Sequence, residues 1–114
     1  MSYDQRLADR VRSVLSKHRG VTERKMFGGL AFMVNDRMCC GVLNRSLVVR
    51  VGKDRYQEAL ARPHVRPMDF TGRPMRGLVY VGPGGSRSTR TLKAWIQQGL
   101  YFVRATSDSQ RRRH

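Results

Sequence analysis

The stretch that decides the fold reads Lys25-Met26-Phe27-Gly28-Gly29-Leu30-Ala31-Phe32-Met33-Val34. Its apolar and aromatic residues are typical of a buried β-strand, but two adjacent glycines interrupt them. A glycine inside a strand pattern marks a bulge, a sharp bend or a close approach of two backbones. The glycine pair therefore predicts a bend at the mouth of the first hairpin. It predicts no chemistry by itself.

Before this stretch, the sequence predicts one amphipathic helix over about residues 3–18. Apolar side chains recur there at three- and four-residue spacing, and Gly20 ends the pattern. Ser2 and Gln5 fit a capping box at the start of the helix. His18 closes the apolar stripe at the other end, where a positively charged imidazole suits the helix dipole and needs no catalytic explanation.

After the glycine pair, the pattern changes to short strands joined by tight turns. Asn35-Asp36 can form a tight turn because both residues tolerate left-handed backbone angles, and the chain is expected to turn again at Asn44-Arg45. In the third strand we expect Leu47, Val49 and Val51 to face the core, with Ser46, Val48 and Arg50 on the other face. Three strands, at residues 30–34, 38–43 and 46–51, therefore form an antiparallel meander.

The rest of the chain predicts a short helix at 54–61, a second hairpin with strands at 68–70 and 75–81, and a last helix capped by Ser88 or Thr89. From Arg104 onward the polar sequence predicts a disordered tail. We therefore expect one domain over residues 1–103, a basic tail over 104–114 and the element order α-βββ-α-ββ-α. The fold class is α+β, two-layered, with a mostly antiparallel five-stranded sheet. One core is expected to hold Leu7, Val11, Phe32, Leu47, Val49, Trp95 and Leu100.

Charge is the strongest signal in the composition. Lys and Arg number 23 against eight Asp and Glu, a formal net charge of +15, and 19 of the cations are arginines. Residues 104–114 carry +3 of this charge, which leaves +12 on the body of the chain. Such a surface attracts polyanions, nucleic acid first and an anionic membrane or an acidic protein second. The alternative is a generally basic surface without a specific partner. Candidate nucleic-acid contacts are Arg50, Arg104, Arg111, Arg112 and Arg113.

The sequence contains no recognisable catalytic or metal-binding motif, and we expect no catalytic residues, no metal and no cofactor. Cys39 and Cys40 are neighbours, so strand alternation should place one in the core and the other on the opposite face. This pair fits a reducing cytosol. No carboxylate pair, Ser-His-acid pattern or H-E-x-x-H motif is present.

The segment Gly82-Pro83-Gly84-Gly85 resembles a phosphate loop only superficially. It lacks the Gly-Lys-Ser/Thr ending, and Pro83 removes one of the amides that such a loop would use. Because Ser86, Ser88 and Thr89 follow closely, an anion site at the start of the last helix stays open.

Several of these residues together resemble the N-terminal domain of the TfoX/Sxy competence regulators. The similarity is carried by Lys25-Met26-Phe27-Gly28-Gly29 and by Tyr80-Val81-Gly82-Pro83, and it covers about residues 4–103. Phe70, Gly72, Met75 and the Trp95 helix also fit. The resemblance implies a two-layer α+β domain similar to the type III secretion chaperone fold. The full-length relatives act as transcriptional coactivators of DNA-uptake genes and carry a C-terminal domain suited to nucleic acid, so a stand-alone N-terminal domain is expected here.

Two functions follow from these observations. The resemblance favours a non-enzymatic regulatory interaction module whose partner is a transcription-related protein or a second copy of the chain. The charge favours a direct nucleic-acid binder, which would not read sequence because no stacking motif accompanies the basic residues. Since no apolar run approaches the ~18 residues of a membrane span, we expect no membrane partner and a cytoplasmic location. A homodimer is also expected.

Overall fold

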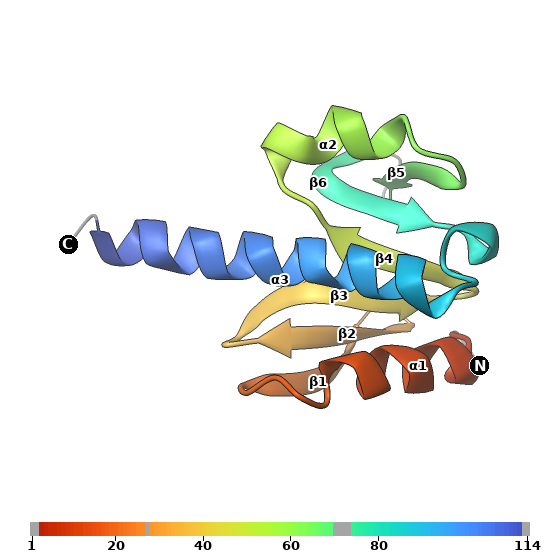
Figure 1. Ribbon diagram of the computed structural model, residues 1–114, viewed down its shortest axis with the longest axis horizontal. Helices are drawn as coiled ribbons and strands as arrows, with labels where there is room; N and C mark the ends of the chain where they lie inside the picture. The colour runs from red at the N-terminus through yellow and green to blue at the C-terminus, as the bar shows by residue number, and fades with distance from the viewer. Residues whose placement is uncertain (1–2, 27, 70–73, 113–114) are drawn as a thin grey trace.

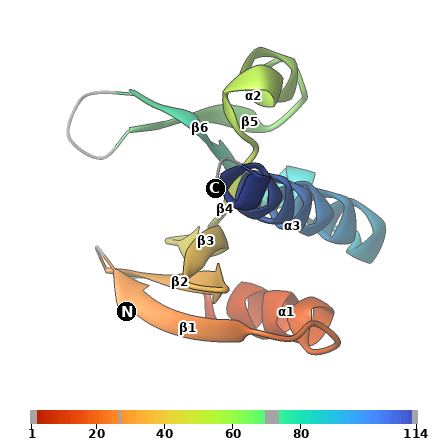
Figure 2. The same ribbon diagram turned by 90° about the vertical axis from the view of Figure 1, so that its left-hand side faces the viewer.

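Residues 3–26, 28–69 and 74–112 are described by the computed structural model of the chain. They form one antiparallel sheet with the strand order β1-β2-β3-β4-β6-β5. Helices α1 and α3 lie on one face of this sheet, and α2 lies over its β5–β6 end (Figure 1, Figure 2). The predicted α+β class is therefore confirmed. The elements are α1 (Gln5–Leu15), β1 (Val21–Met26), β2 (Gly29–Val34), β3 (Arg37–Leu43), β4 (Ser46–Arg50), α2 (Lys53–Leu60), β5 (Val65–Asp69), β6 (Pro74–Val81), the 3₁₀ turn η1 (Pro83–Gly85) and α3 (Thr89–Arg112).

The prediction of five strands is wrong, because the described residues form six. The additional strand is β1, in which four polar or charged residues separate Val21 from Met26. It pairs along its whole length with β2, from Val21 opposite Val34 to Met26 opposite Gly29. No alternation of apolar residues announces such a strand. Its exposed charges are typical of a sheet edge, where they discourage pairing with other chains.

The glycine pair joins β1 to β2 in the way the sequence predicts, by a change of direction and a close backbone approach. Gly28 has a φ of +78°, a left-handed value that favours glycine. A Cβ on Gly29 would lie 2.6 Å from the carbonyl oxygen of Val42 on β3, so only a glycine fits there. Phe27 lies outside the described residues. The next turn is also confirmed, since Asn35 and Asp36 both have positive φ values.

Helix α1 is shorter than the sequence predicts. Asp4 is its N-cap, and the Asp4 carboxylate accepts hydrogen bonds from the backbone N–H groups of Arg6 (2.8 Å) and Leu7 (3.2 Å). Ser2, the cap predicted from the sequence, lies outside the described residues. The helix ends at Leu15, and His18 follows in a half-buried turn whose N–H donates to the Leu15 carbonyl (3.0 Å).

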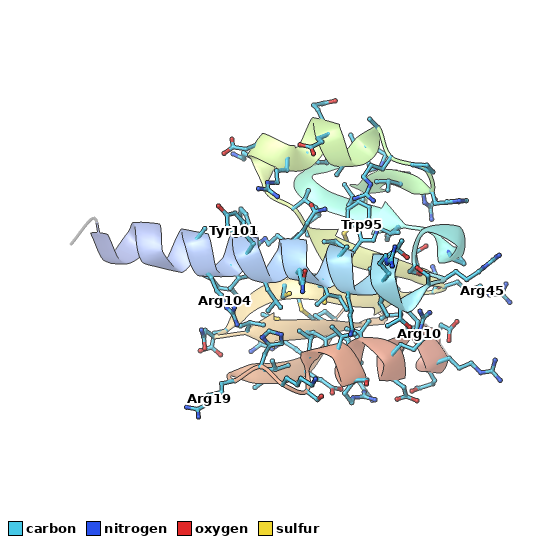
Figure 3. All side chains as sticks on the ribbon, in the orientation of Figure 1. Arg10, Arg19, Arg45, Trp95, Tyr101 and Arg104 are labelled. Atoms are coloured by element: carbon cyan, nitrogen blue, oxygen red, sulfur yellow. The ribbon has the colours of Figure 1, made fainter. Side chains whose placement is uncertain are left out.

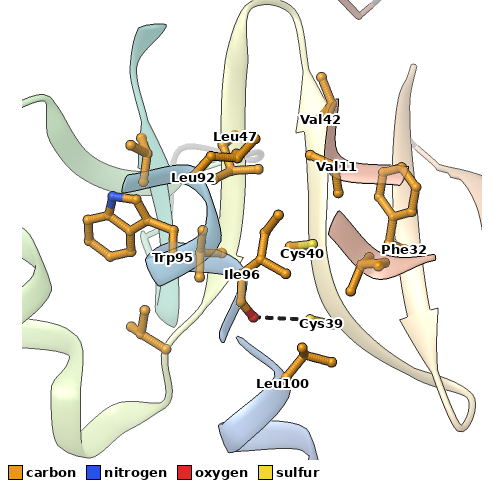
Figure 4. Close-up of a cluster of buried hydrophobic side chains, with 14 of the residues drawn as sticks. Val11, Phe32, Cys39, Cys40, Val42, Leu47, Leu92, Trp95, Ile96 and Leu100 are labelled. Carbon is orange, nitrogen blue, oxygen red and sulfur yellow. Dashed lines mark hydrogen bonds between the residues drawn. The ribbon is translucent and has the colours of Figure 1, made fainter. Parts of the chain in front are cut away.

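Cys39 and Cys40 both lie in the main core, so the prediction that they face opposite sides of the sheet is wrong. Phe32 pairs with Cys40 and Met33 pairs with Met38, which leaves Cys39 as the additional residue of a β-bulge. A bulge interrupts the alternation of side chains along a strand. Both thiols are free and fully buried, and Cys39 Sγ lies 3.8 Å from the carbonyl oxygen of Ile96 on α3 (Figure 4). The seven predicted core residues all belong to this same cluster.

The sheet face away from α1 and α3 carries a second, smaller apolar cluster. Val48, Met68 and Leu78 are buried in it, and Met38, Leu43 and Tyr80 pack against it. Val48 therefore lies on the predicted face, away from the main core. Its side chain is only 2% exposed, because the second cluster covers it. Ser46 is buried as well.

Helix α3 begins as predicted and continues further than predicted. The Ser88 hydroxyl caps it by accepting a hydrogen bond from the Thr91 N–H (3.1 Å). The sequence predicts a disordered tail from Arg104, but the backbone continues as helix to Arg112 and extends beyond the sheet (Figure 1). No glycine or proline follows Gly99 to interrupt it. The buried stripe of α3 consists of Leu92, Trp95, Ile96, Gly99, Leu100 and Val103.

The glycine-rich segment before α3 forms η1 and supports a histidine. A Cβ on Gly84 would lie 2.5 Å from the His64 ring, and the Gly82 N–H donates to the His64 carbonyl (2.8 Å). His64 itself has a positive φ of 65°. The segment thus connects β6 to α3, as the sequence predicts. Its close packing against His64 is a finding of the structure. No helix among the described residues is both long and apolar enough to cross a membrane.

Candidate nucleic-acid interface

Most of the positive charge on the described surface has no carboxylate partner. Among the described residues, Arg12 alone forms ion pairs with carboxylates, at 2.6 Å to both Asp9 and Glu23. The Arg12 guanidinium lowers the pKa of Glu23, chiefly through its hydrogen bond to the carboxylate, while partial burial acts in the opposite direction. Exposed arginines such as Arg19 and Arg45 extend from the ends of the molecule into solvent (Figure 3). The uncompensated charge is therefore available to an external anion.

Four arginines lie on aromatic rings, and we call them the ring-seated arginines. Such contacts occur roughly once per 70–80 residues in proteins, so four in this chain are about two to three times the usual number. The distances from guanidinium carbon to ring centroid are 5.5 Å for Arg50 on Phe102, 5.1 Å for Arg55 on Tyr101, 4.6 Å for Arg62 on Trp95 and 4.8 Å for Arg66 on Tyr80.

Three of these arginines contact rings on α3. Arg50 comes from β4, Arg55 from α2 and Arg62 from the segment after α2. Tyr101 is 61% exposed, and it lies on the side of α3 that faces α2 (Figure 3). Phe102 approaches Gly52 so closely that a Cβ there would lie 2.5 Å from the ring, and Gly52 has a φ of +85°. The backbone at Gly52 therefore fixes where Phe102, and with it Arg50, can lie.

A guanidinium that stacks on a ring still presents its N–H groups along its edge. Arg55, Arg62 and Arg66 are exposed residues, so an external ligand can reach them. The planar fork of an arginine matches the oxygens of a phosphate in a two-point hydrogen bond. The rings restrict the side chains in advance, which reduces the conformational entropy that binding would cost.

Arg50 differs from the other three because it is half-buried. Burial, and secondarily the positive charge of Arg37, lowers the pKa of Arg50 from its ordinary value. Because the ordinary pKa of an arginine lies so far above neutral pH, Arg50 keeps its positive charge. Arg50 is thus a half-buried positive charge without a carboxylate partner among the described residues.

Arg104, the second predicted contact, lies on a different side of α3. Its Nη2 donates to Nδ1 of His18, 3.1 Å away, so it joins α3 to the turn after α1. Positions 102 and 104 of a helix lie about 200° apart, so Arg104 and the ring under Arg50 point in nearly opposite directions. The structure therefore does not bring Arg50 and Arg104 together. Arg111 and Arg112 belong to the last turn of α3, and Arg113 lies outside the described residues.

The residues that carry the family resemblance occupy structural positions. Lys25 and Met26 end β1, and Gly28 and Gly29 form the turn described above. Tyr80 lies on β6 under Arg66, and Pro83 opens η1. Of these, Tyr80 alone contributes to the ring-seated arginines.

Sequence reasoning missed three of the ring-seated arginines, namely Arg55, Arg62 and Arg66. Each ring is far from its arginine in the sequence or lies on a neighbouring strand, so no spacing rule connects them. Among the described residues, no group of three or more His, Cys, Asp or Glu side chains is placed to hold a metal ion. What the arrangement offers is charge and hydrogen-bond donors in fixed positions, which suits binding to phosphate oxygens.

Comparison with known proteins adds a family to this geometry. No curated protein and no solved structure matches the chain. The family model described as the TfoX N-terminal domain matches residues 13–103, which covers most of the chain and includes both motifs of the predicted resemblance. The chain therefore belongs to the TfoX N-terminal domain family.

Proposed function

We propose that this chain is a non-enzymatic regulatory module that binds nucleic acid through the phosphate backbone without reading the bases. Membership of the TfoX N-terminal domain family supports a module of the competence-regulator kind. The net charge of +15 supports a polyanionic partner over an apolar one. The regulatory action would then consist in holding this module on nucleic acid.

The observation that carries the proposal is the set of ring-seated arginines. Their guanidinium carbons lie over aromatic rings at 4.6–5.5 Å from the ring centroids, and three of the four arginines are exposed. Backbone phosphates repeat along nucleic acid whatever its sequence, so donors fixed in this way give affinity but no base discrimination.

The experiment is a fluorescence-anisotropy titration of labelled DNA duplexes of unrelated sequence with the full chain at physiological salt. Sequence-independent binding is expected, with dissociation constants of about 10⁻⁴ to 10⁻⁶ M, as is usual for backbone binding. A duplex that stays unbound even at low salt would contradict the proposal. That result would favour the protein-directed module, whether its partner is a transcription-related protein or a second copy of the chain.

A matched pair of variants tests whether the ring-seated arginines matter beyond their charge. The triple substitution R55Q/R62Q/R66Q removes three exposed ring-seated charges. We expect this variant to lose more affinity than a control with the same change in charge. Equal losses would show that net charge alone acts. The control is R6Q/R24Q/R45Q, three exposed arginines that lie on no aromatic ring within the described part of the chain.

A further inference from the structure

A groove between α1 and the first half of α3 has the features of a separate binding site. Its volume is about 320 Å³. Sites for small ligands range from roughly 300 to 1,000 Å³, so this groove suits a small ligand. Figure 3 shows Arg10 at the boundary between the two helices. The groove is lined by Arg10, Ser13, Val14, Lys17, Thr89, Leu92 and Lys93.

The lining carries three positive charges and no negative one. Arg10 comes from α1, Lys17 from the turn that follows α1, and Lys93 from α3, and all three line the same groove. The Arg10 Nη2 donates to the carbonyl oxygen of Arg87 at 2.9 Å, which holds this guanidinium at the start of α3. Neither Lys17 nor Lys93 makes a hydrogen bond or an ion pair within the described part of the chain. Like charges gathered in this way repel one another until an anion neutralises them.

The remaining lining residues suit a ligand that is polar at one end and apolar at the other. Ser13 and Thr89 supply exposed hydroxyl groups, and Thr89 is the first residue of α3, where the helix dipole adds to the positive potential. Val14 and the buried Leu92 supply an apolar floor. The charges, the hydroxyl groups and the apolar floor thus come from α1, the turn after it and α3, which only the fold brings together.

We propose that this groove binds a small phosphorylated ligand of mononucleotide size. The phosphate lies between Arg10, Lys17 and Lys93, and the less polar part of the ligand contacts Val14 and Leu92. A phosphate monoester carries a charge of −1.5 to −2 near neutral pH, which three cations neutralise. The site does not depend on the ring-seated arginines, because none of them lines the groove.

The test is a calorimetric titration of the full chain with pyrophosphate and with adenosine monophosphate at physiological salt. We expect saturable binding of one equivalent of each. The variant K17Q/K93Q should weaken it by at least about tenfold, because it removes two charged donors. The charge-preserving K17R/K93R should retain most of the affinity. Absence of saturable binding to the wild-type chain would overturn the proposal.

The chain offers a matched control because it has four lysines in all. K25Q/K53Q removes the other two, which are exposed on β1 and α2, and it should change ligand affinity by less than about twofold. Equal weakening in both variants would overturn the proposal, since it would mean non-specific attraction to the basic surface.

Duplex DNA, titrated into the same two variants, separates this site from the proposed function. Each variant loses two charges, so both should lose DNA affinity to a similar extent. Binding of DNA without binding of either small phosphate would overturn the groove site and leave the proposed function standing. Binding of the small phosphates without binding of DNA would support the groove site and overturn the proposed function.

Discussion

Gly99 on α3 rests directly on Cys39 at the β-bulge of β3. A Cβ on Gly99 would overlap the carbonyl oxygen of Cys39 and lie 3.0 Å from its Sγ. The absence of a side chain at position 99 therefore lets α3 reach the bulged strand. The bulge and the glycine are two halves of one helix–sheet contact.

The substitution G99A should destabilise the chain by about 1–3 kcal/mol, the usual cost of overpacking a core. Alanine normally stabilises a helix relative to glycine by up to about 1 kcal/mol, so the sign reports the contact with Cys39. Thermal unfolding followed by circular dichroism measures the change. The control is Q97A, an exposed substitution in the same helix, which should be close to neutral. A G99A variant more stable than the wild type would contradict this packing.

The thiols of Cys39 and Cys40 should not react with a thiol reagent while the chain is folded. Both are fully buried, and the adjacent Cys39 together with burial raises the pKa of Cys40. The folded state thus favours the protonated thiol, so its stabilisation is present at neutral pH and is lost as pH rises above about 8.5, where an unfolded thiol ionises. Absorbance with a chromogenic disulfide measures the reaction. Two thiols should appear in denaturant, and rapid labelling without denaturant would contradict the burial.

Acid should weaken the attachment of α1 to β1. Arg12 lowers the pKa of Glu23, so this pair stabilises the folded state above the unfolded pKa of Glu23 and loses its effect as pH falls through the lower folded value. Because the pair is largely exposed, its contribution should be about 0.5 kcal/mol. Denaturant unfolding from pH 7 to pH 3 compares E23Q with the wild type. Their stabilities should converge in acid, and a constant difference would contradict the linkage.

The ring of Tyr101 should matter for DNA binding although the residue carries no charge. Y101L removes the surface under Arg55 while net charge stays unchanged, and it should weaken duplex binding by about two- to fivefold. Y101F keeps the ring and should bind like the wild type. Anisotropy titrations measure both variants. An unchanged affinity in Y101L would mean that Arg55 needs no ring to hold it.

The sequence predicted the helices and strands in which apolar residues recur at regular spacing, because burial of one face requires such spacing. The apolar stripes of α1 and α3 and the strands around Phe32 and Leu47 follow this rule. β1 has no such spacing, since it is held by pairing with β2 and not by burial of its own side chains. Cys39 faces the core because a β-bulge adds one residue to β3 opposite β2. Simple alternation of side chains does not predict such a bulge.

The candidate sites were predicted less well, and for a different reason. Arg50 was predicted to point away from the core and to contact nucleic acid, but the ring beside it comes from α3, far along the chain. Lys17, in the turn after α1, and Lys93, on α3, line one groove, and each alone looks like an ordinary exposed cation. A site made by pairs distant in sequence becomes visible only when the fold has brought them together.

The salt dependence of duplex binding tests the central claim most directly. If the chain neutralises six or more phosphates, its affinity should fall on the order of a thousandfold or more between about 50 and 200 mM salt. The variant R111Q/R112Q/R113Q removes three charges near the C-terminus of the sequence, and it should reduce the slope of log K against log salt by up to about 2.7. A steep slope that this variant flattens is the predicted result. Absence of binding, or an affinity that does not change with salt, would contradict the account.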